Sequence, residues 1–212
     1  MGAERVFSAA STLWHRLFMS TGQSSVVAMS VMATGHRSIH HPAVVREALV
    51  AVLGRWSARA AICGGAEGAD TLFAEAALSS ETPIDVYLPN RYYRDHYPNA
   101  IPDELLAAAR RVTYVVDRPD VDDWRRRWRT ERWWRDNHAR NYAMVDLADR
   151  AIVVARDHPW RLLGQEGGTA ACVRSLRGRG VRHVWWVPDR ALDAEPRLVT
   201  LTGQRDSQQA LF

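Results

Sequence analysis

Short apolar runs alternate with amphipathic stretches through most of the chain. The apolar runs are rich in β-branched residues or bounded by turn residues, which favours buried strands. These runs cover 25–32, 60–63, 84–88, 112–116, 151–155 and 181–187. Helical spacing of apolar residues marks 42–56, 71–78, 103–109, 137–148 and 169–177. The alternation predicts an α/β domain, a Rossmann-like three-layer sandwich with a mainly parallel sheet and helices on both faces.

The two ends of the chain depart from this alternation. We expect residues 1–25 to form a flexible N-terminal extension, 26–188 the domain, and 189–212 a C-terminal tail that could hold one edge strand at 198–201. No apolar run reaches the roughly 18 residues that a transmembrane helix needs. The short N-terminal apolar patch around Leu13 and Trp14 is broken by polar residues, which does not fit a secretory signal. We therefore expect a cytoplasmic protein with no membrane partner.

The composition narrows the chemistry. The 212 residues are 47% hydrophobic and 25% charged, which is ordinary for a globular domain. All 28 basic residues are Arg, so Schiff-base and phosphate-loop lysines are excluded. Cys63 and Cys172 form no CxxC pair, and we expect no metal site and no cofactor. The net charge of +4 permits an anionic partner without requiring one.

The first of three glycine-containing turns follows the first predicted strand, at 33–37. Ligands of such sheets bind beyond the carboxyl ends of the strands. Gly35 allows a tight turn, Thr34 and His36 offer hydrogen-bond donors, and Arg37 offers a bidentate fork. The alternative is a plain strand–helix connection.

The second turn, 64–70, contains three glycines between a predicted strand and a helix. Gly64, Gly65 and Gly68, with Ala66 among them, leave backbone N–H groups open to a phosphate at a helix N-terminus. Asp70 either contacts the ligand or caps the helix. The spacing of these glycines matches neither GxGxxG nor the phosphate loop of nucleoside triphosphatases.

The third turn opens the next helix with Gly167, Gly168 and Thr169. The Thr169 hydroxyl can either bond a phosphate oxygen or cap that helix. Arg140 and Asn141 stand at the expected exposed N-terminal part of the helix predicted at 137–148. They either hold a phosphate and a sugar or are plain surface residues.

These segments, in this order, resemble the SLOG superfamily, the Rossmann-like group that includes DprA, the LOG phosphoribohydrolases and the YpsA-like proteins. The matching segments are 34–37, 64–70, 140–141 with Met144 and 148–149, and 167–169. The first two look closest to the YpsA-like branch. The resemblance implies a nucleotide or nucleotide-derived ligand at the carboxyl edge of the sheet, bound by a sensor or processing protein.

The catalytic pattern of the LOG enzymes is matched only in part. Those enzymes split a nucleoside 5′-monophosphate into base and ribose 5-phosphate, and their motif ends in G-T-x-x-E. Arg140 matches their arginine, but Cys172 stands at the position of the glutamate. Glu67 or Glu166 could supply the carboxylate that cleavage of an N-glycosidic bond requires. We place ligand binding first and keep this hydrolysis as the alternative.

Two further segments leave other partners open. Residues 124–135 interleave six arginines with four tryptophans. This segment could pack on the domain or on a second subunit of a homodimer, clamp a charged ligand, or bind single-stranded nucleic acid. The chain ends in QQALF, which resembles the QxxLF peptides that dock on the bacterial sliding clamp through residues such as Gln208, Leu211 and Phe212. The alternative is that Leu211 and Phe212 pack on the domain.

Overall fold

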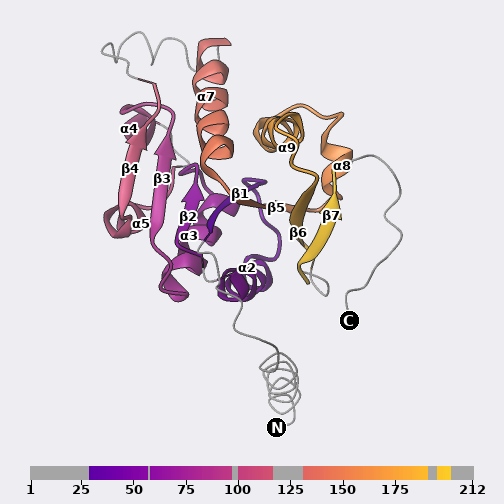
Figure 1. The fold of residues 1–212 in the computed structure, drawn as a ribbon. Helices are drawn as coiled ribbons and strands as arrows, with labels where there is room; N and C mark the ends of the chain where they lie inside the picture. The colour runs from indigo at the N-terminus through magenta and orange to yellow at the C-terminus, as the bar shows by residue number, and fades with distance from the viewer. Residues whose placement is uncertain (1–28, 57, 97–99, 117–130, 191–194, 202–212) are drawn as a thin grey trace.

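One sheet organises the molecule. The computed structural model describes residues 29–56, 58–96, 100–116, 131–190 and 195–201. Within these residues seven strands pair in the order β4-β3-β2-β1-β5-β6-β7 (Figure 1). All neighbours are parallel except β6 and β7, which are antiparallel. The strands are β1 (Ser30–Gly35), β2 (Ala60–Cys63), β3 (Ile84–Leu88), β4 (Arg111–Tyr114), β5 (Arg150–Ala155), β6 (His183–Pro188) and β7 (Arg197–Thr200).

Helices cover both faces of this sheet. Successive side chains of a strand point to opposite faces, so Val31 and Ala33 pack in one core with α2 and α3, while Met32 packs in a second core with α7 and α9. Figure 1 shows the same two layers, with α2 and α3 on one side of the sheet and α7 and α9 on the other. The predicted three-layer α/β fold is confirmed. The helices are α2 (Pro42–Trp56), α3 (Ala69–Ser79), α4 (Tyr93–His96), α5 (Asp103–Ala108), α7 (Glu131–Leu147), α8 (Pro159–Leu162) and α9 (Gly168–Gly178).

The strand order places a switch point beside the central strand. From β1 the chain adds β2, β3 and β4 on one side, then returns to pair β5 with the other side of β1. The helices of the first half lie on one face and those of the second half on the other. The connections after β1 and β5 therefore diverge and leave a crevice beyond the carboxyl ends of these two strands, which is where open α/β sheets bind ligands.

The first strand extends further than its apolar run indicated. The sequence pattern placed the strand end at Met32 and a turn at 33–37. In the structure Thr34 and Gly35 are still paired, with Val153 and Val154 of β5. The polar Thr34 ended the apolar pattern, but β5 supplies the partner that continues the ladder. The expected edge strand near 198–201 is present as β7, one residue earlier.

Helix α7 also begins earlier than predicted, and this corrects the environment of two site residues. It starts at Glu131, so Arg140 and Asn141 lie in its middle and are 6% and 4% exposed. The prediction that they lie at an exposed N-terminal part of the helix is wrong. Its first turns are polar and aromatic and carry no apolar period to reveal them. Leu147, at the other end of the helix, is 49% exposed.

Some predictions fall outside the described residues. These are the N-terminal extension 1–25, the part 124–130 of the Arg/Trp segment, and the terminal residues Gln208, Leu211 and Phe212. Among the helices that the structure describes, none is both long and apolar enough to cross a membrane.

Candidate functional site

A cavity of about 410 Å³ lies at the switch point, beyond the carboxyl ends of β1 and β5. Its walls come from the end of β1, the loops after β1, β2 and β5, the middle of α7 and the amino end of α9. It brings together nearly all the residues that the sequence singled out. Those that line it are Thr34, Gly35, His36, Arg37, Ala66, Glu67, Asp70, Arg140, Asn141, Glu166, Gly167, Gly168 and Thr169.

Gly64, Gly65 and Gly68 are not in this lining, and close packing explains why each is glycine. A Cβ at Gly64 would overlap the Arg140 guanidinium, and one at Gly68 would overlap the Arg37 carbonyl. Gly65 faces the core beside Leu88, and both Gly65 and Gly68 have positive φ. These glycines let the loop after β2 lie close to its neighbours. Their contact with phosphate stays a prediction.

Arg140 ties α7 to the end of β2. Its Nη1 donates to the Gly64 carbonyl and lies 3.9 Å from Asp70 Oδ2. The same Asp70 oxygen accepts from the Ala66 N–H at 3.1 Å. Burial raises the pKa of the Asp70 carboxyl, and the Arg140 charge opposes that rise. The buried Arg140 Nε has no hydrogen-bond partner among the described residues.

Two side chains position the amino end of α9. Asn141 Nδ2 donates to the Gly168 carbonyl at 3.4 Å, and Thr169 Oγ1 donates to the Gly35 carbonyl at 2.6 Å. Since a hydroxyl has one proton, Thr169 keeps only acceptor capacity toward the cavity. The backbone N–H groups of the first turn are the donors that remain at this end of α9, because no side chain caps the helix. This first turn lines the cavity. The helix dipole adds a positive partial charge there.

The cavity lining carries charges of both signs. Arg37, Arg140 and Arg156 contribute guanidinium groups, and the carboxylates come from Glu67, Asp70 and Glu166. Burial lowers the pKa of His36, and the charge of Arg156 lowers it further. Its imidazole is therefore neutral at pH 7. Such a lining can neutralise an anion while offering acceptors to hydroxyl groups.

Several lining residues were not singled out individually from the sequence, and Trp134 was considered only as part of the Arg/Trp segment 124–135. Trp134 and His138 stand one turn apart on α7, with ring centroids 6.3 Å apart. Burial lowers the pKa of His138, and the charge of Arg174 lowers it further. Arg156 directly follows β5, as His36 follows β1. Position after a strand was the signal for Arg156, but no glycine accompanied it. The other missed residues are Ser38, Asn137, Leu162, Gln165 and Ala170.

Cys172, at the LOG glutamate position, packs in the core between the sheet and α9 and does not line the cavity. Burial raises the pKa of its thiol to about 11, so it is a thiol at neutral pH and a poor nucleophile. Burial also raises the pKa of Cys63. Within the described part of the chain, no three His, Cys, Asp or Glu residues are grouped so that they could hold a metal ion.

Comparison with known proteins shows distant likeness only. No protein-family model matches the chain, and no curated protein matches it. The solved structure of TM1055 is 13% identical, with 72% of this chain and 70% of that one covered, at a TM-score of 0.46. DNA processing protein A from Helicobacter pylori, studied for its single-stranded DNA binding mode, is 16% identical over 79% and 68% of the two chains, at a TM-score of 0.48. At these identities the likeness concerns the fold and not the ligand.

Proposed function

We propose that the cavity at the switch point binds a nucleotide or a nucleotide-derived ligand. The observation that carries this is that the amino end of α9, uncapped by any side chain, lines the same cavity as the buried Arg140. Backbone N–H groups at a helix N-terminus and a guanidinium are complementary to phosphate. The cavity volume of about 410 Å³ falls within the range of small-molecule sites.

The remaining lining suits the other parts of a nucleotide. Glu67 and Glu166 accept hydrogen bonds, which ribose hydroxyls can donate. Trp134 is 42% exposed and presents an aromatic surface on which a base can stack. Met144 and Leu162 also line the cavity and add apolar atoms to it. A phosphate, a sugar and a base would each find matching chemistry in one cavity.

Thermal stability and calorimetric titration against AMP, GMP, CMP, UMP, NAD, ADP-ribose and cyclic nucleotides test this proposal. A ligand at a hundred times its dissociation constant adds about 2.7 kcal/mol to the stability. We expect one class to bind, and Arg37→Gln to weaken it about tenfold. Arg46→Gln removes the same charge from an exposed position of α2 and is the matched control. Absence of binding to every compound in the panel would overturn the proposal.

Hydrolysis of an N-glycosidic bond is the second candidate, because Glu67, Glu166 and Arg140 line one cavity. A carboxylate near the sugar can activate water or stabilise positive charge there. The test is release of adenine from AMP, followed by chromatography, for the wild type and for Glu67→Gln and Glu166→Gln. Release that one variant abolishes supports an enzyme. AMP binding without release supports a binding protein.

A further inference from the structure

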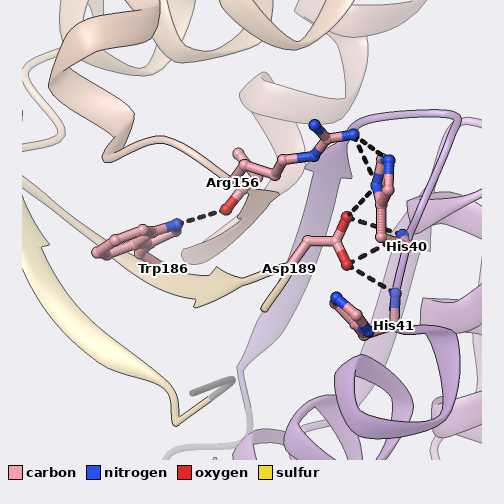
Figure 2. A network of polar contacts seen from close by, with 6 residues as sticks. His40, His41, Arg156, Trp186 and Asp189 are labelled. Carbon is pink, nitrogen blue, oxygen red and sulfur yellow. Dashed lines mark hydrogen bonds and ion pairs between the residues drawn. The ribbon is translucent and has the colours of Figure 1, made fainter. Parts of the chain in front are cut away.

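Arg156 directly follows β5 and lines the cavity. Its guanidinium contacts His40, which lies outside the cavity lining (Figure 2). Its Nη2 lies 2.7 Å from Nδ1 of His40 and closer still to Nε2. His40 belongs to the loop between β1 and α2 and does not line the cavity. Its Nδ1 lies 3.2 Å from Oδ2 of Asp189, the residue that follows β6. Three loops therefore meet through three side chains.

Asp189 is the fixed end of this chain of contacts. Its side chain is 1% exposed, and its carboxylate accepts from the backbone N–H groups of His40 and His41, each at 2.9 Å. These N–H groups directly precede Pro42, where α2 begins, so the carboxylate also stabilises the amino end of that helix. Burial alone would raise the pKa of Asp189, but these hydrogen bonds outweigh it and lower the pKa.

The ionised carboxylate determines which nitrogen of His40 carries the proton. A carboxylate only accepts hydrogen bonds, so Nδ1 must carry the proton that points to Asp189. In the neutral ring Nε2 then has a lone pair, which accepts from Arg156 Nη2. The hydrogen bonds therefore run in one direction: Arg156 donates to His40, and His40 donates to Asp189. The remaining N–H groups of Arg156 are left for other acceptors.

We propose that Asp189 and His40 are positioning residues for Arg156, and that Arg156 binds a phosphate group of the ligand on the β5 side of the cavity. This inference rests on the proposed function. Arg140 is tied to the end of β2 and Arg156 follows β5, and β1 lies between these strands. The two guanidinium groups therefore approach the cavity from opposite sides of the central strand.

The first test needs no ligand. Long-range ¹H–¹⁵N correlation spectra of the full chain at alkaline pH, where imidazoles are neutral, report the tautomer of His40. We expect the proton on Nδ1, and a loss of that strong preference in Asp189→Asn. A proton on Nε2 in the wild type would overturn the positioning role. Because this readout is independent of binding, it separates failure of the positioning role from failure of the proposed function.

The second test measures AMP and adenosine affinity by calorimetry in a double-mutant cycle. We expect Arg156→Gln to weaken AMP about tenfold or more and to leave adenosine unchanged. His40→Ala should weaken AMP about threefold to tenfold alone but have no further effect in the Arg156→Gln protein. His40→Gln, which restores an acceptor, should recover part of the loss. His41→Ala keeps the backbone N–H that Asp189 uses and is the matched control.

The outcomes of this cycle separate positioning from general stability. A merely structural role for His40 would weaken AMP equally in both backgrounds, or weaken adenosine as well, and either result would overturn the proposal. If the wild type binds no AMP, Arg156 is not an AMP phosphate ligand and that part of the proposal fails. The tautomer then decides whether Asp189 and His40 position Arg156.

Discussion

The hydroxyl of Thr169 donates to the carbonyl of Gly35 at 2.6 Å, which joins the amino end of α9 to the end of the central strand. Both residues line the cavity. The bond holds the α9 N–H groups next to the carboxyl end of β1. It also uses the only proton of the hydroxyl, so Thr169 builds the site instead of donating to an anion.

Replacing Thr169 by valine keeps the shape and removes this bond. We expect Thr169→Val to lower the free energy of unfolding by about 1–2 kcal/mol, because the Gly35 carbonyl loses its hydroxyl donor. Urea denaturation measures the loss. Thr169→Ser keeps the hydroxyl and should remain closer to the wild type. Equal stability of the valine variant would show that this bond contributes nothing.

Gly35 has no room for a side chain. A Cβ there would lie 2.5 Å from Ala69 Cβ and 2.5 Å from the Val154 carbonyl oxygen. We expect Gly35→Ala to lower the free energy of unfolding by about 1–3 kcal/mol or more, because backbone and helix must move apart. Gly54 in α2 has open space around it, so Gly54→Ala should stabilise by about 0.5–1 kcal/mol. The opposite signs are read from the two midpoints of urea denaturation.

Asp70 and Arg140 are both buried, and removing one leaves the charge of the other uncompensated. We expect Arg140→Met to cost about 3 kcal/mol of unfolding free energy. Adding Asp70→Asn should recover part of this loss, because it removes the carboxylate left without its cation. Chemical denaturation of the two single variants and the double variant gives the coupling. Additive losses would mean that the 3.9 Å pair is not coupled.

Asp189 should make stability depend on pH in the acid range. Its pKa is lower in the folded protein than its ordinary value. A lowered carboxyl pKa contributes stability above the unfolded pKa, and this contribution is lost as the pH falls through the folded pKa. Asp189→Asn should therefore be less stable than wild type at pH 7, and the difference should shrink below about pH 4.

Thermal unfolding across pH measures this difference between the two proteins. Asp103→Asn changes a largely exposed carboxyl and is the control for loss of charge. A difference for Asp189→Asn that is constant from neutral to acid pH would contradict the role of the ionised carboxylate.

Trp134 tests where a base would bind. Base stacking on an aromatic side chain contributes about 1–3 kcal/mol, so we expect Trp134→Ala to weaken AMP by about fivefold to a hundredfold. Ribose 5-phosphate, which has no base, should keep its affinity. Trp160 is similarly exposed at 43% but lies outside the cavity lining, so Trp160→Ala is the matched control. Calorimetry that shows equal losses for both compounds would place the base elsewhere.

The predicted site came largely from one rule applied to local signals. Gly35, Gly168 and Thr169 each mark the passage between a strand and a helix, and parallel strands bring such passages to one edge of the sheet. The cavity accordingly gathers them. Arg156 also directly follows a strand, but no glycine accompanies it. Its contact with His40, a residue far away in the sequence, appears only in the tertiary structure.

The glycines after β2 illustrate the limit of composition. The cluster indicated a backbone open to phosphate, yet Gly64 and Gly68 are placed against Arg140 and Arg37. A glycine in the sequence shows that a side chain is absent, but it does not show which neighbouring group fills that space in the folded protein. The start of α7 could not be predicted from the local pattern either, because its first turns contain Trp and Arg and show no apolar periodicity.

The sequence by itself determined the alternation of strands and helices and the edge of the sheet where chemistry gathers, because both follow from local hydrophobic periodicity and the geometry of parallel sheets. The tertiary structure alone decided which side chains meet there. Arg140 with Gly64, Thr169 with Gly35 and Asp189 with His40 join segments distant along the chain. Such contacts arise only once packing has set strand order and register, and neither composition nor spacing encodes them.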